Sequence, residues 1–153
     1  MATFTDSAPI KRAIVRRART GNGGALNAAL VGGIHQSLAP RKIAYPFMVW
    51  DEVDAPFTRD WGSNGGQMRE IRALYDLTIY ASNPVEAENL GQLVDALYND
   101  AETEMDSLVD GQTVYNCTVV GPRPDNGPDR DDTGAYFVRI GHTVEIWTHQ
   151  VGT

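Results

Sequence analysis

The chain of 153 residues contains 13 Lys and Arg against 20 Asp and Glu, which gives a net charge of −7. Its hydrophobic fraction of 42% is that of a globular protein, so the composition predicts one folded domain over residues 1–153 and excludes a disordered chain. The apolar runs are much shorter than a bilayer-spanning helix and Cys117 is the single cysteine, so we expect no membrane span and no internal disulfide.

The charges are divided unevenly along the chain. Residues 1–50 contain seven basic residues and one acid, whereas residues 51–153 contain six basic residues and 19 acids. This division permits head-to-tail contact between the basic face of one copy and the acidic face of the next. It also permits pairing of these charges within one subunit, or a basic arm that binds nucleic acid. The acidic remainder argues against a dedicated DNA-binding protein, because such a protein needs a larger basic face.

The first 50 residues predict two helices and a strand. Pro9 suits the first turn of a helix over 8–20, with Asp6 or Ser7 as its cap. The basic face of this helix consists of Arg12, Arg16 and Arg19. The other elements expected here are a glycine break at 21–24, a short helix over 25–31, a loop over 35–42, and a strand entering at Pro46.

Two long strands and one strong helix are predicted farther along the chain. Apolar and polar residues alternate over 69–82 and again over 136–146, as in strands that bury one face, and the second strand is expected to reach almost to the C-terminus. Asn83 and Pro84 open a helix whose apolar residues recur at helical spacing. The same phase continues to Leu108, so we expect this helix to run past Glu102.

One shorter strand and two polar loops complete the prediction. The strand covers 114–120 and is expected to stop at Gly121 and Pro122. Segment 51–67 is interpreted as a long loop or the tip of a hairpin, and segment 123–134 as an acidic, turn-rich loop. The order of elements predicts an α+β fold, a mixed and mainly antiparallel sheet of about four strands with helices packed on one face.

The histidines and the cysteine do not have the pattern of a catalytic site. His35, His142 and His149 lack the spacing of zinc ligands, and the last two point to opposite faces of one predicted strand. Cys117 lies in the middle of a predicted strand, where cysteine usually behaves as a small buried residue. We therefore expect no catalytic residues, no cofactor and no enzymatic activity.

The loop acids are the remaining candidates for a metal site. Asp51, Glu52 and Asp54 could gather around a divalent cation, and so could the aspartates of residues 125–132. Neither group has the spacing of a calcium loop, so we expect solvated acidic loops and no metal.

Two aromatic residues, Phe57 and Trp61, lie in the predicted loop over 51–67. They either tuck under that loop or anchor a partner, because aromatic side chains dominate the energetics of interfaces.

The order of these segments resembles a known family. The resemblance rests on the strand entry Tyr45-Pro46-Phe47-Met48-Val49, on the strand that runs directly into a helix in LTIYASNPVEAENLGQLVDALYNDAE (Leu77–Glu102), and on the last strand YFVRIGHTVEIWTHQ (Tyr136–Gln150). Over residues 25–150 the chain is similar to the tail terminator, or tail completion, proteins of long-tailed bacteriophages. The basic helical segment 1–24 has no counterpart in this resemblance.

The resemblance implies a structural virion protein that is assembled in the cytoplasm of a bacterial host and sits at the head-proximal end of the tail. Such proteins form a homohexameric ring that caps the tail tube, stops its polymerisation and joins the tail to the head or neck connector. DNA passes through the bore of the ring without specific binding. The resemblance also implies a sheet with helices on one face, no catalytic residues and no cofactor.

The sequence suggests residues for contacts between subunits, for contacts with the tube, or for lining the bore. These candidates are Arg12, Arg16, Arg19, Asp54, Phe57, Trp61, Asp125, Asp129, Asp131 and Asp132. Acidic loops repel phosphate, so the segments 54–67 and 123–133 are candidates for the bore or the ring faces.

Two other functions remain open from the sequence. The first is another neck, head-completion or minor tail adaptor protein, which would bind partners without terminating a tube. The second, more distant, is a small metal-dependent hydrolase that uses Asp51, Glu52 and Asp54.

Overall fold

The computed structural model describes residues 6–53, 56–62, 68–124 and 128–151. The helices are α1 (Ala8–Thr20), the 3-10 turn η1 (Gly21–Gly24), α2 (Ala25–Ala29), α3 (Pro84–Tyr98) and α4 (Glu102–Asp106). The strands are β1 (Ile34–Gln36), β2 (Phe47–Glu52), β3 (Phe57–Trp61), β4 (Met68–Ala81), β5 (Thr113–Pro124), β6 (Asp129–Arg130) and β7 (Tyr136–Val151).

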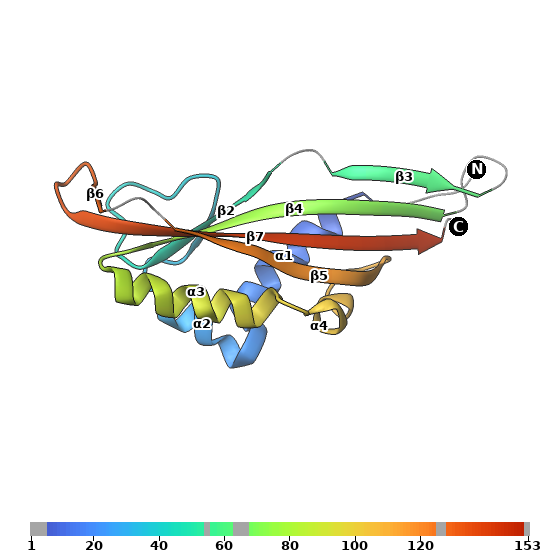
Figure 1. Ribbon diagram of the computed structural model, residues 1–153, viewed down its shortest axis with the longest axis horizontal. Coiled ribbons are helices and arrows are strands. Elements are labelled where there is room, and N and C mark those ends of the chain that lie inside the picture. The colour runs from blue at the N-terminus through green and yellow to red at the C-terminus, as the bar shows by residue number, and fades with distance from the viewer. Residues whose placement is uncertain (1–5, 54–55, 63–67, 125–127, 152–153) are drawn as a thin grey trace.

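One layer of strands is covered by helices on one side (Figure 1). The strand order is β1-β2-β4-β7-β5, with β3 paired to β4 and β6 paired to β7. Only β1 and β2 run parallel among the described pairs. The predicted α+β class, the mainly antiparallel sheet and the helices on one face are confirmed. The expected four strands are an undercount, because the described residues form seven.

The two long central strands carry the core. β4 pairs with β7 without interruption from Met68, opposite Val151, to Ala81, opposite Val138. Every second residue of β4 from Ile71 to Ala81 is at most 2% exposed, whereas the residues between them are half-buried. This alternation confirms the predicted strand and gives the sheet one face for the helices and one open face.

Helix α1 is held to the sheet by an apolar stripe and to α3 by two hydrogen bonds. Ile10, Ile14 and Ala18 are fully buried, as the spacing predicts. The Tyr98 hydroxyl of α3 donates to the Ile14 carbonyl oxygen at 2.6 Å. Arg17 Nε donates to the Leu97 carbonyl oxygen at 2.9 Å, so the position of α1 is fixed by directional contacts as well as by burial.

Three strands were absent from the sequence prediction, each for a physical reason. β1 has three residues, two of which lie in the segment 35–42 expected to be a loop, and it exists only through its parallel pairing with the distant β2. β3 is exposed at all five positions, so it has no apolar alternation to reveal it. β6 has two residues, which is too short for any periodicity.

Two predicted boundaries are also wrong. The helix expected to run past Glu102 ends at Tyr98, because Asn99 is extended and Asp100 has a φ of 51° before α4 begins. β5 does not stop at Gly121 and Pro122 but continues through a shift in register to Pro124. β5 lies at a sheet edge, where a proline removes no necessary hydrogen bond from the ladder.

Candidate functional surfaces

The basic face of α1 borders a groove beside the first strand. The groove has a volume of about 510 Å³ and lies between α1 and residues Gln36 of β1 and Trp50 of β2. Its basic lining residues are Lys11, Arg12, Arg16 and Arg19. We call this feature the basic groove, and its apolar lining includes Val15 and Trp50.

Three of the cations in the basic groove are free to meet a partner. Lys11 Nζ lies 3.3 Å from Glu52 Oε2, so its charge is compensated within the subunit. Arg12, Arg16 and Arg19 are exposed, and their guanidinium groups have no partner among the described residues. The sequence placed these three arginines on one face correctly, but it did not reveal the groove.

An acidic surface lies between α3 and β5. Residues 100–110, here called the acidic segment, contain five acids and no basic residue: Asp100, Glu102, Glu104, Asp106 and Asp110. The segment includes α4, which packs mainly against β5. Asp106 Oδ1 accepts a hydrogen bond from the Val114 amide at 2.9 Å, which ties the segment to the start of β5. This surface was not predicted from the sequence, although an acidic run without a base was a visible signal.

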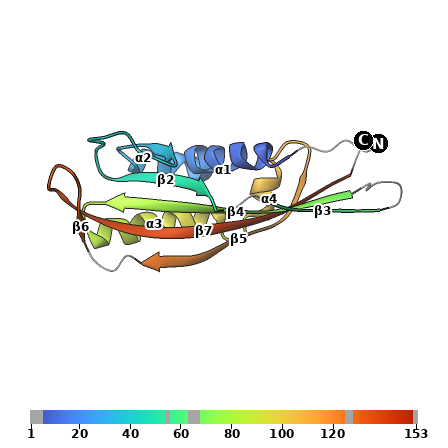
Figure 2. The same cartoon turned by 90° about the horizontal axis from the view of Figure 1, so that it is seen from above.

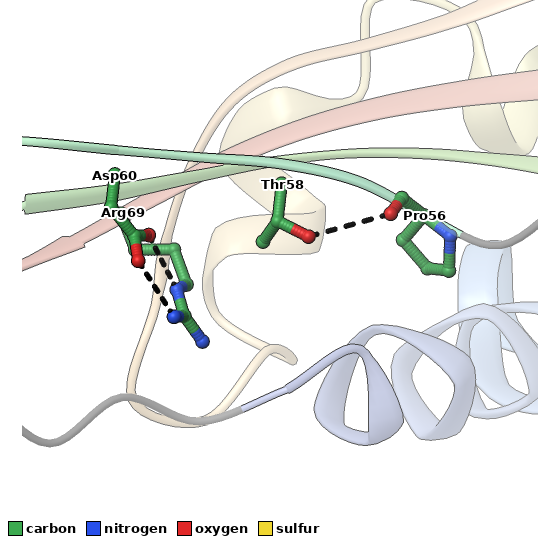
Figure 3. A network of polar contacts seen from close by, with 4 residues as sticks. All are labelled: Pro56, Thr58, Asp60 and Arg69. Carbon is green, nitrogen blue, oxygen red and sulfur yellow. Dashed lines mark hydrogen bonds and ion pairs between the residues drawn. The ribbon is translucent and has the colours of Figure 1, made fainter.

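Strand β3 presents two large aromatic side chains to solvent. Phe57 is 54% exposed and Trp61 is 39% exposed, so neither is tucked under a loop. Arg59 lies over the Trp61 ring at 4.2 Å. Neighbouring β3 and β4 are joined by Asp60 and Arg69, whose two hydrogen bonds measure 2.7 and 2.8 Å (Figure 3). Those hydrogen bonds hold the pKa of the Asp60 carboxyl below its usual value.

The hairpin of β6 and β7 carries the second set of predicted acids. Asp129 Oδ2 accepts from Arg139 at 2.9 Å. Asp131 Oδ2 accepts from the Tyr45 hydroxyl at 2.8 Å, and its other oxygen accepts from Thr133. These hydrogen bonds lower the pKa of Asp131 to about 2. Two of the predicted carboxylates are therefore engaged within the subunit.

The remaining acids of the prediction are placed only in part. Asp132 is exposed. Asp54 and Asp125 lie outside the described residues.

The structure separates the acids proposed for a hydrolase. Asp51 and Glu52 are consecutive on β2 and point to opposite faces, Asp51 beside Asp76 and Glu52 beside Tyr75. The Glu52 carboxylate is paired with Lys11. Within the described ranges, no three His, Cys, Asp or Glu side chains are grouped so that they could hold a metal ion.

The other reactive groups are buried in the core. Cys117 Sγ donates to the Tyr98 carbonyl oxygen at 3.2 Å, and burial raises the pKa of the thiol to about 12. His142 is 2% exposed, and burial lowers the pKa of its ring, with Asp95 opposing that shift and Arg123 adding to it. A thiol held in this way is a weak nucleophile.

No helix in the described part of the chain has the length and apolar character needed to cross a membrane.

Comparisons with known proteins give a match in structure but none in sequence. No protein-family model matches the chain, and no curated protein sequence matches it. Among solved structures, the fold is similar to a chain of the "virion of native gene transfer agent (GTA) particle", with a TM-score of 0.66. The match covers 96% of this chain and 99% of that chain at 11% sequence identity. At this identity the likeness shows a shared fold and nothing finer.

Proposed function

We propose that this chain is a structural virion protein that forms a hexameric ring on the end of a tail tube. The ring stops polymerisation of the tube and offers its other face to the head or neck connector. DNA passes through its bore without specific binding. The proposal includes no chemical step, and the protein acts by its shape and contacts alone.

The observation that carries this proposal is the similarity, over nearly the whole of both chains, to a chain of a virion particle. The match covers 96% of this chain and 99% of that chain, so the fold as a whole is what the two chains share. The sequence resemblance to tail terminator proteins over residues 25–150 supports the same class of function.

The two different ends of the sheet support a closed ring of identical subunits. A ring requires a heterologous contact, in which one surface of a subunit meets a different surface of the next. The sheet ends in two different strands, β1 on one side and β5 on the other, and each pairs with one described neighbour. Figure 2 shows α1 and β2 along one long side of the molecule and β5 along the other.

The test is the mass of the protein by light scattering, alone and with tail tubes assembled from the tube protein of the same virus. We expect six copies per tube end, with tube growth blocked at that end by electron microscopy. A protein that stays a monomer under both conditions would refute the ring. Binding at the head or neck without an effect on tube length would assign the chain to the adaptor class instead.

A further inference from the structure

We propose that the basic groove of one subunit docks on the acidic segment of the next copy of this chain. This inference rests on the proposed ring and assigns its subunit interface. It joins two surfaces whose charged side chains, Lys11 aside, have no ion-pair partner among the described residues of the same subunit.

The first observation is the composition of the basic groove. Arg12, Arg16 and Arg19 border it without a partner among the described residues, while Val15 supplies a half-buried apolar surface beside them. A groove that combines free guanidinium groups with apolar lining suits a protein segment that carries carboxylates and an apolar side chain.

The second observation is that the acidic segment offers this chemistry. It has five acids and no base, and none of the five makes an ion pair among the described residues. Leu108, which is half-buried, adds an apolar side chain to the same segment. Opposite charges across an interface fix its register and exclude contact between two like surfaces.

The third observation is the position of the two surfaces in the fold. The basic groove opens beside β1, which is one end of the strand order, through its lining residue Gln36. The acidic segment leads into β5, the other end, and α4 packs mainly against that strand, with a smaller contact to α1 of the same subunit. Contact between these surfaces is heterologous, so it continues from copy to copy and can close into a ring.

A second copy fits the basic groove better than DNA does. Three arginines border the groove, whereas the chain from residue 51 onward carries an excess of 13 negative charges that repels a polyanion. DNA binding remains a measurable outcome of the experiment below.

The experiment uses complementary charge reversal in the intact protein. The groove variant carries Arg12→Glu, Arg16→Glu and Arg19→Glu, and the segment variant carries Glu102→Lys, Glu104→Lys and Asp110→Lys. Five of the six positions are exposed and Glu102 is half-buried, so circular dichroism checks that each variant folds. The variants are compared by native mass spectrometry under the conditions in which the unmodified protein forms its ring.

Each variant alone is expected to lose the ring, with self-association weakened by at least roughly tenfold, because three attractive contacts become repulsive. An equimolar mixture is expected to restore it. In the mixture each reversed groove meets a reversed segment and each native groove meets a native segment. Six is an even number, so an alternating ring closes and has a mass of three copies of each variant.

The matched control reverses two exposed cations outside the basic groove, Arg41→Glu and Lys42→Glu. This control is expected to assemble normally. Rings that persist in either triple variant, or a mixture that is not restored, would overturn the interface while leaving the ring itself in place. The interface would also be overturned if the groove variant lost binding to duplex DNA while its assembly stayed unchanged. An unmodified protein that never forms a ring refutes the proposed function instead.

Discussion

Replacing Tyr98 by Phe tests the contact that positions α1 over the sheet. The Tyr98 hydroxyl is fully buried and donates to the Ile14 carbonyl oxygen at 2.6 Å. The substitution removes this donor and keeps the ring in place. The Ile14 carbonyl oxygen also lies within the hydrogen-bonded part of α1, so it does not lose its last partner. We therefore expect the loss of an ordinary net hydrogen bond, about 1 kcal/mol of unfolding free energy.

For a protein of this size, 1 kcal/mol corresponds to a fall in melting temperature of about 2–4 °C. Urea unfolding followed by circular dichroism measures the same change in free energy independently. The slope of the unfolding free energy against urea concentration is expected to stay unchanged. Tyr136→Phe is the control, because Tyr136 is 55% exposed. Removal of its hydroxyl group is expected to change the unfolding free energy by less than about 0.5 kcal/mol. Equal stability of Tyr98→Phe and the unmodified protein would refute the reasoning.

Three further predictions concern one tightly packed glycine and two buried side chains. Gly32→Ala is expected to cost at least about 2 kcal/mol in thermal or urea unfolding, because its Cβ would lie 2.0 Å from the Ala44 carbonyl oxygen; wild-type stability would contradict this. Cys117 is expected to react with a thiol reagent only when the protein unfolds, so rapid labelling of the native protein would contradict its burial. His142 has a lowered pKa in the folded state, so its contribution to stability is present above its ordinary pKa of 6.5 and is lost as the pH falls through the folded value. The drop in melting temperature from about pH 7 to about pH 5 should therefore shrink in His142→Gln, and an unchanged drop would exclude this residue as a cause.

The long elements of the fold could be predicted because each carries its own local signal. β4 and β7 show alternation over many residues, and α3 begins with Asn83, whose side chain accepts from the Glu86 amide at 2.9 Å. The elements that escaped prediction depend on partners far away in the sequence. β1 has no signal without β2, and the break after Tyr98 depends on the conformation of Asp100 rather than on hydrophobic spacing.

The surfaces were less predictable than the fold. Spacing alone places Arg12, Arg16 and Arg19 together, because helical geometry is local. The groove beside them also requires Trp50 and Gln36, which reach α1 only through the tertiary fold. The acids of the last hairpin were predicted to be solvated, but Asp131 accepts a hydrogen bond from Tyr45. Nothing near Asp131 in the sequence indicates this distant partner.

The position of β7 between β4 and β5 has a consequence for how the molecule forms. β4 and β5 each pair with β7 and not with one another, so the sheet stays divided until β7 is in place. Folds dominated by such distant pairings tend to fold slowly, in milliseconds to seconds. During synthesis, β4 therefore presents an unpaired backbone edge, beside an apolar face, until β7 has been made. The nascent chain in this interval is the form most exposed to aggregation and to capture by chaperones.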